Sequence, residues 1–184
     1  MKQKFDKKEI LVPTVSLFII ALVATLLLSI VNGLTAGKIA AAQAQAETEA
    51  RQSVFPESKS FKEEKDYFIA EDESGKTIGY VFSNSEKGYG GDVAVTVGID
   101  KNGSITGIVP GDLSNETPGL GQTANNPDFI KQFKGKSGKI KLVKSAPHGN
   151  EIKALTSATV TSTAVTNAVN ASISQFEAIS GGVK

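Results

Sequence analysis

Hydroxyl side chains gather in one short segment near the C-terminus. Seven of the eleven residues from 156 to 166 are Thr or Ser, beginning with Thr156-Ser157-Ala158-Thr159-Val160-Thr161-Ser162. Apolar residues then recur every three or four positions, which predicts a helix over residues 162–179. One hydroxyl is enough to cap a helix N-terminus, so capping accounts for only part of the cluster. A helix N-terminus also favours phosphate, so a phosphate-bearing ligand is the chemical alternative.

A second segment, Glu116-Thr117-Pro118-Gly119-Leu120-Gly121, combines a carboxylate with two glycines and a proline. Glycine and proline disfavour regular helix and strand, and glycine is used where the backbone turns sharply or approaches another group closely. The segment is therefore either an ordinary loop or part of a ligand site.

The rest of the composition limits the chemistry that the side chains can perform unaided. The 184-residue chain has no Cys, one His and one Met, which excludes disulfides, Cys-ligated iron–sulfur clusters and Cys nucleophiles. The turn-like context of His148, between Pro147 and Gly149, indicates a solvated loop histidine. A formal net charge of +1 gives no reason to bind nucleic acid. We expect no catalytic residue and no metal site, so redox chemistry would need an added cofactor.

Residues 10–31 form an uncharged apolar block near the N-terminus. As a helix these 22 residues would extend roughly 33 Å, enough to cross a hydrocarbon core of about 30 Å. The alternative is a cleaved signal peptide, whose apolar core is usually shorter, about 7–15 residues. The block is preceded by Lys2, Lys4, Lys7 and Lys8. The positive-inside rule then predicts a single-pass protein of the cell membrane (inner or plasma membrane), with a cytoplasmic N-terminus and an extracytoplasmic C-terminal domain.

The remainder divides into a helical connection and a domain of strands and helices. Residues 34–52 are rich in Ala, Gln and Glu, which favour a helix, and Pro56 would end it. Alternating or β-prone segments predict strands at residues 67–70, 77–82, 93–99, 105–109 and 140–143, with a hairpin turn at Asn102-Gly103 and a helix start at Asn126-Pro127. We therefore expect an α+β fold with an antiparallel-rich sheet and a few helices. The expected divisions are a cytoplasmic tail at 1–9, a transmembrane helix at 10–32, a helical stalk and linker at 33–60 and a domain at 61–184.

Several motifs in a fixed order make the chain similar to a known family. It resembles the G subunit of the Rnf electron-transport complex, which is related to the C subunit of the sodium-pumping NADH:quinone reductase. The resemblance extends from the N-terminal span to the final helix. It rests on Val54-Phe55-Pro56, Gly88-Tyr89-Gly90-Gly91, Val97-Gly98-Ile99-Asp100, residues 116–121 and residues 156–162.

The resemblance implies an FMN cofactor that is bound covalently, through its phosphate, to a threonine hydroxyl. The acceptor motif of the family reads Ser/Thr-Gly-Ala-Thr, and its last residue corresponds to Thr159. The loop at residues 116–121 would lie beside the flavin ring, and the Gly-Tyr-Gly-Gly turn would help to shape the pocket. The expected cofactor-binding residues are Thr159 as the phosphoester, with Thr156, Ser157, Ala158, Val160, Thr161, Glu116, Thr117, Gly119 and Leu120.

Two positions depart from the pattern of the family. Ser157 stands where Gly is usual. Lys153 stands where many members have Asp, a residue associated with recognition by the flavin-attaching transferase. Both departures bear on the efficiency of flavin attachment, and Glu151 is a candidate replacement for the missing acid.

The resemblance also implies a role as an electron-carrier subunit of an ion-translocating oxidoreductase. Such a complex couples ferredoxin oxidation and NAD reduction to sodium or proton export, and the partners would be the other Rnf subunits, the flavin transferase and the membrane. The span carries no ionisable residue, so it would not form the ion path alone. The alternatives are a membrane-anchored structural or interaction module, as in pilin-like proteins, and a secreted solute-binding domain. A pilin-like module has no need of the segments at 116–121 and 156–161.

Overall fold

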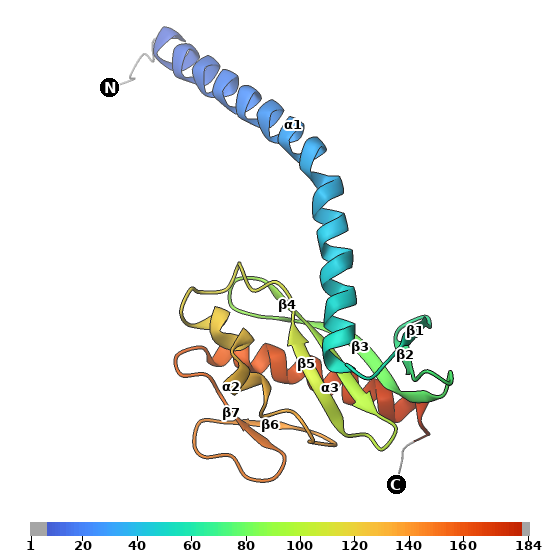
Figure 1. The fold of residues 1–184 in the computed structure, drawn as a ribbon. Helices are drawn as coiled ribbons and strands as arrows, with labels where there is room; N and C mark the ends of the chain where they lie inside the picture. Colours follow the sequence, from blue (N-terminus) through green and yellow to red (C-terminus); the bar gives the residue numbers. More distant parts are fainter. Residues whose placement is uncertain (1–6, 182–184) are drawn as a thin grey trace. The chain divides into compact units, whose positions relative to one another are not determined.

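The computed structural model describes residues 7–181, so most of the expected cytoplasmic tail lies outside the described residues. The chain forms two compact units, of which the first ends at Ala46 and the second begins at Glu47. The elements, in order, are α1 (Lys7–Val54), β1 (Ser60–Glu63), β2 (Phe68–Glu71), β3 (Thr77–Lys87), β4 (Asp92–Asp100), β5 (Ile105–Pro110), η1 (Gly121–Asn125), α2 (Pro127–Ile130), β6 (Lys141–Val143), β7 (Glu151–Lys153) and α3 (Thr159–Ile179) (Figure 1).

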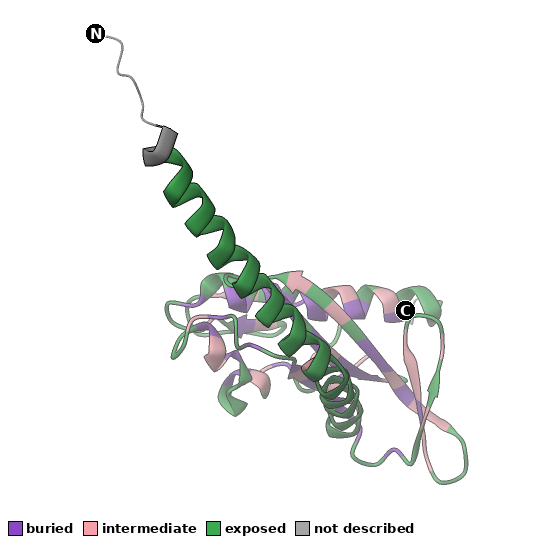
Figure 2. Ribbon diagram, turned by 90° about the horizontal axis from the view of Figure 1, so that it is seen from above, coloured by how far each residue is buried: buried purple, intermediate pink, exposed green. Residues whose placement is uncertain are grey.

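The first element, α1, is an unbroken helix. Its most apolar window has a mean hydropathy of 2.7 and is wholly unburied, as the exposed colouring of the helix shows (Figure 2). The hydroxyls of Thr14, Thr25 and Thr35 donate to carbonyls four residues earlier, so they need no partner outside the helix. Among the described residues, α1 is the one helix that is long and apolar enough to be a candidate membrane span.

Strands β1 to β5 form an antiparallel sheet in which each strand pairs with its neighbour in sequence. The side chains of Val93, Val95 and Val97 in β4 are buried on one face, as their alternation predicts. The turn between β4 and β5 is closed by Asp100, whose Oδ1 accepts from the amides of Asn102 (2.8 Å) and Ser104 (2.9 Å). The predicted hairpin is therefore confirmed.

Helix α3 covers one face of this sheet and packs on β3 and β4. Its buried apolar residues, including Val165, Val169, Ile173 and Phe176, join the main core cluster with the valines of β4. Residues such as Ser, Thr and Asn give this helix poor intrinsic propensity, so the packed face stabilises it. Full burial of each large apolar side chain contributes about 1.5–3 kcal/mol.

The opposite face of the sheet receives the end of α1. Val54 and Phe55 form a second buried cluster with Ala70 and Val81. Phe55 lies directly over Gly79, where an added Cβ would approach Phe55 Cζ to 2.3 Å. The Thr106 hydroxyl donates to the Val54 carbonyl at 2.7 Å. Through these contacts the end of α1 belongs to the second compact unit.

A long connection with short elements joins β5 to α3. It contains η1, then α2, whose predicted start is confirmed because the Asn126 side chain accepts from the Asp128 amide at 2.9 Å. Strands β6 and β7 follow as a separate parallel pair. From Lys153, the end of β7, only a few residues lead to the start of α3 at Thr159. This connection brings the segments at residues 116–121 and 156–162 together at the N-terminal end of α3.

The α+β class with an antiparallel sheet is confirmed, and the differences lie at the ends of elements. The last helix begins at Thr159 and not at Ser162, so part of the hydroxyl cluster is helical. Strands β1 and β7 were not predicted, because each is short and its pairing partner decides its conformation. The expected stalk is a continuation of α1 up to Val54.

Candidate functional site

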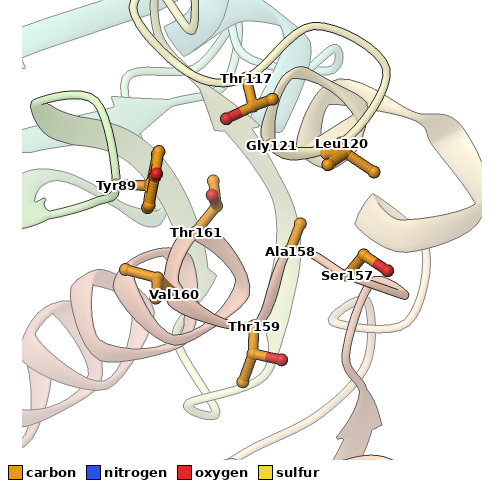
Figure 3. A pocket seen from close by; sticks show the side chains of 9 residues that line it. All are labelled: Tyr89, Thr117, Leu120, Gly121, Ser157, Ala158, Thr159, Val160 and Thr161. Atoms are coloured by element: carbon orange, nitrogen blue, oxygen red, sulfur yellow. The ribbon is translucent and has the colours of Figure 1, made fainter.

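A pocket lies where three segments of the compact domain meet at the N-terminal end of α3 (Figure 3). The segments are the turn at residues 88–91, the loop at 116–121 and the start of α3 with the residues before it. The cavity has a volume of about 440 Å³, within the range of about 300–1,000 Å³ that is usual for small-molecule sites. Its lining residues are Tyr89, Thr117, Leu120, Gly121, Ser157, Ala158, Thr159, Val160 and Thr161.

The buried carboxylate of Glu116 joins these three segments. Glu116 is only 3% exposed. Its Oε1 accepts from the backbone amides of Tyr89 (2.9 Å) and Gly90 (3.0 Å). Its Oε2 accepts from the Thr161 hydroxyl at 2.5 Å. The Glu116 side chain therefore holds together the turn after β3, its own loop and the first turn of α3.

The hydrogen bonds also decide the ionisation of Glu116. Burial by itself would raise the pKa of this carboxyl group. The hydroxyl of Thr161 and the amides of Gly90 and Tyr89 outweigh that effect, and the pKa lies below its usual value. Glu116 is therefore a carboxylate at neutral pH. Because its three donors are neutral groups, they do not neutralise the negative charge of Glu116, which lies at the wall of the pocket.

Glycines surround Glu116 because other residues would not fit. An added Cβ would lie 2.4 Å from Glu116 Oε1 at Gly88 and 2.5 Å from Oε2 at Gly121. At Gly90 it would lie 1.7 Å from the Asn115 carbonyl oxygen. The glycines of the two motifs thus allow the three segments to close around the carboxylate.

The N-terminus of α3 opens into the pocket without a side-chain cap. Its N-cap residue is Ala158, and no side chain accepts from the amides of the first turn. The first amides of a helix have no partner within the helix, so those of Thr159, Val160 and Thr161 can bind an anionic group. The Thr159 side chain is exposed, and its hydroxyl has no hydrogen-bond partner among residues 7–181.

The expectation that one of the clustered hydroxyls caps this helix is wrong. The hydroxyls of Ser162, Thr163 and Thr166 donate instead to the carbonyls four residues earlier. Ser162 Oγ also accepts from the Leu155 amide at 3.0 Å, which ties the preceding segment to the helix. With the helix starting at Thr159, the cap position falls on an alanine, and alanine has no oxygen to offer.

Ser157 has a backbone φ of 61° and is the one non-glycine residue with positive φ in the described part of the chain. An L-residue with a Cβ is strained in this region, whereas glycine adopts it freely. A glycine at this position would adopt the same conformation without strain. Ser157 adopts this conformation at a cost in conformational energy.

The structure brings together most of the residues singled out in the sequence. Thr117, Leu120, Ser157, Ala158, Thr159, Val160 and Thr161 line the cavity. Glu116 lies behind its wall, whereas Thr156 and Gly119 do not line it. Sequence reasoning left Tyr89 and Gly121 out of the cofactor-binding set. The sequence feature that could have indicated Tyr89 is a large aromatic residue inside a glycine-rich turn, Gly88-Tyr89-Gly90-Gly91.

Lys153 and Glu151 precede the hydroxyl-rich segment and do not line the cavity. Lys153 is exposed in β7, and its amide donates to the Gln132 side chain at 2.7 Å. Glu151 accepts from the His148 amide at 3.1 Å, and His148 is exposed in a loop, as predicted. No group of three or more metal-ligating side chains occurs among the described residues.

Comparison with known proteins places this geometry in a family. Residues 1–54 match the RnfG N-terminal region, and residues 88–174 match the FMN-binding domain family. The chain is 36% identical to the G subunit of the Na⁺-translocating ferredoxin:NAD⁺ oxidoreductase complex of Acetobacterium woodii, over 97% of each chain. The chain belongs to the RnfG family. It is also 30% identical to the G subunit of the proton-translocating ferredoxin:NAD⁺ oxidoreductase complex of Clostridium ljungdahlii, over 99% of this chain and 100% of that one.

Two solved structures are similar to this RnfG-family chain in fold. Shewanella oneidensis NqrC has a TM-score of 0.52 and 28% identity over 56% of this chain and 52% of its own. The C subunit of the Na⁺-translocating NADH-quinone reductase of Parabacteroides distasonis has a TM-score of 0.54 and 23% identity over 64% and 63%. The matched region covers between half and two thirds of each of these structures. The two TM-scores support the α+β fold. Membership of the RnfG family disfavours a pilin-like module.

A Glu116→Gln substitution tests the role of the carboxylate. At pH 7 we expect it to lower the free energy of unfolding by about 1–3 kcal/mol, because buried charge-assisted hydrogen bonds are weakened. The pKa of Glu116 is lowered in the folded state, so its stabilisation is present above the unfolded-state pKa of about 4.3 and is lost as the pH falls through the folded pKa. The difference between wild type and variant should therefore shrink below about pH 4. Denaturant unfolding of the full chain at a series of pH values measures it.

Glu177→Gln is the matched control, since Glu177 is an exposed carboxylate on the same helix, α3. We expect it to change stability by less than about 0.5 kcal/mol at every pH. A Glu116→Gln difference that stays constant from neutral to acidic pH would contradict the assignment.

Replacing Ser157 by glycine tests the strain at φ 61°. The left-handed backbone conformation costs a residue with a Cβ about 1–2 kcal/mol, and glycine removes this strain. Glycine also makes the unfolded chain more flexible, which lowers the stability of the fold by about 0.4–1 kcal/mol. We therefore expect Ser157→Gly to raise the free energy of unfolding by up to about 1.5 kcal/mol. Ser174→Gly, at an exposed position inside α3, should instead lower it. Destabilisation by both substitutions would argue against strain at Ser157.

Proposed function

We propose that this chain is an electron-carrier subunit of a membrane-bound Rnf-type complex that couples electron transfer between ferredoxin and NAD to sodium or proton translocation. The names of its relatives support this role, since they are G subunits of ferredoxin:NAD⁺ oxidoreductase complexes. The match of residues 88–174 to the FMN-binding domain family supports FMN as its redox group. Other subunits of the complex would be its electron donor and acceptor.

In this proposal the FMN is attached through its phosphate to Oγ1 of Thr159. One observation carries the assignment: Thr159 combines an exposed, unpartnered hydroxyl with the uncapped N-terminus of α3, inside the pocket. The backbone amides of Thr159, Val160 and Thr161 can donate to phosphate oxygens, and the helix dipole favours their negative charge. A flavin transferase would form the bond during maturation.

The other lining residues suit the remaining parts of a flavin. Leu120 and Val160 are exposed apolar side chains that would contact the ring system. The Thr117 side chain provides a polar group at the same mouth, while Ser157 and Ala158 form the wall beside the phosphate end (Figure 3). Glu116 and Gly119 would act indirectly, by holding the loop, and Thr156 would position the acceptor segment.

FMN supplies one- and two-electron redox chemistry when it is bound. The part of the protein is to bind and orient it, and the described residues that line the pocket include no group placed as a proton-abstracting base. Glu116 is unsuited to that task, because its carboxylate is buried and its two oxygens already accept three hydrogen bonds. The single helix α1 would anchor the subunit, with the C-terminal domain outside the cytoplasm.

Thr159→Ala tests the attachment. The full chain, coexpressed with a flavin transferase, should retain yellow, fluorescent flavin through denaturing electrophoresis, and Thr159→Ala should lose it. Thr163→Ala is the matched control, because Thr163 lies one turn further along α3 and its hydroxyl already donates to the Thr159 carbonyl. It should label like the wild type. A colourless wild type, or a flavin mapped by peptide mass spectrometry to another residue, would contradict the proposal.

Protease protection tests the proposed orientation. With the N-terminus in the cytoplasm, protease added to cells whose outer face is accessible should digest residues 60–184. In sealed inside-out vesicles the same residues should be protected until detergent is added. Digestion from the cytoplasmic face would reverse the topology.

A further inference from the structure

Tyr89 is unusually exposed for an aromatic residue at the wall of a cavity. It is 75% exposed and lines the pocket. Outside α1, only four large apolar residues of the described chain are exposed, and Tyr89, Leu120 and Val160 are three of them. All three line this pocket. Exposed apolar side chains therefore concentrate at a single mouth.

The backbone that carries Tyr89 is held in place, although its ring is not packed. The Tyr89 and Gly90 amides donate to Glu116, and the Gly88 amide donates to the Gly91 carbonyl at 2.7 Å. Gly88 and Gly90 have no room for a Cβ, so the turn lies close against Glu116 and the Asn115 carbonyl. The position of the Tyr89 Cα is thus determined by contacts in which its ring takes no part.

The other two tyrosines of the chain behave differently. Tyr67 and Tyr80 pack edge-to-face with ring centroids 6.0 Å apart, and they contact Phe82 and Phe176 of the core. Tyr89 has no aromatic contact among the described residues. Burial of a large ring stabilises a fold, and a ring left in water contributes none of that stabilisation. The turn at residues 88–91 is fixed by hydrogen bonds and places the unpacked Tyr89 ring beside the pocket, where a planar ligand could lie against it.

We infer that the Tyr89 side chain forms an aromatic wall against which the ring system of the bound flavin lies. This inference rests on the proposed function and deepens it. Figure 3 shows Tyr89 and Leu120 on different sides of the pocket, with Thr161 and Ala158 between them and Thr159 below. A flavin attached at Thr159 would thus extend its ring between Tyr89 and Leu120. Offset or edge-to-face contact between the two ring systems orients the flavin and shields one side from water. Tyr89 is accordingly a positioning residue.

Flavin fluorescence provides a direct test. An electron-rich phenol in contact with an excited flavin donates an electron and receives it back, which quenches the emission, whereas an alkyl side chain does not. The full chain, loaded with flavin and purified in detergent, is compared with Tyr89→Leu, Tyr89→Phe and Tyr67→Phe. Covalent flavin is quantified after denaturation, and fluorescence lifetime and yield are then expressed per bound flavin.

The inference predicts a several-fold longer mean lifetime and higher yield for Tyr89→Leu at equal flavin content. Tyr89→Phe should be similarly bright, because phenylalanine is a poor electron donor, but it should keep the flavin less accessible to iodide than Tyr89→Leu does. Tyr67→Phe should match the wild type. Unchanged unfolding midpoints are expected for the Tyr89 variants, since the ring is unpacked.

Two results would overturn the inference separately from the proposed function. If Tyr89→Leu carries covalent flavin with the lifetime and iodide accessibility of the wild type, the flavin is attached but does not contact Tyr89. If Tyr67→Phe brightens as much as Tyr89→Leu, the brightening is not specific to a tyrosine at the pocket, and contact between Tyr89 and the flavin is not its cause. A wild type without bound flavin would contradict the proposed function and this inference together.

Discussion

The hydrogen bonds of the Glu116 carboxylate are the constraint on which the site depends. They join backbone amides at residues 89 and 90 to a hydroxyl at residue 161, across a long stretch of sequence. A charged group that is 3% exposed is tolerable only when its oxygens are satisfied, so all three segments must approach it. That approach requires glycine at residues 88 and 121. The pocket is the space that these segments leave in front of the carboxylate.

The same constraint orients the start of α3. Thr161 lies in the first turn, and its hydroxyl reaches back to Glu116. Thr159 and Val160, on neighbouring positions, then face the cavity with their amides uncapped. A side-chain cap on this helix would have filled the place that an anion can take. The absence of a cap in this described part of the chain, which costs some helix stability, is consistent with a ligand that supplies the missing acceptor.

The sheet provides the rigid support behind these loops. It is buried on one face by α3 and on the other by Val54 and Phe55. The turn after β3 and the loop after β5 both emerge near the N-terminal end of α3 (Figure 1). A chain with no cysteine and one histidine cannot build a redox centre from its own side chains, and its hydroxyls and backbone amides instead suit an attached cofactor.

The sequence by itself determined the local features of this protein, and the tertiary structure decided the rest. The apolar block in α1, the valine alternation of β4 and the Asp100 turn follow from residues close in the chain, because hydrophobic periodicity and turn chemistry act locally. The hydroxyl-rich and glycine-rich segments could also be recognised in the sequence, and their family resemblance predicted Thr159 as the residue that carries the flavin phosphate. The start of α3, the pairing of β7 with β6 and the partners of Glu116 were not predictable, since each depends on residues brought together only by folding. For the same reason the sequence left Tyr89 out of the binding set: a tyrosine beside glycines is an ordinary turn residue until the fold places it, exposed, at the mouth of a pocket.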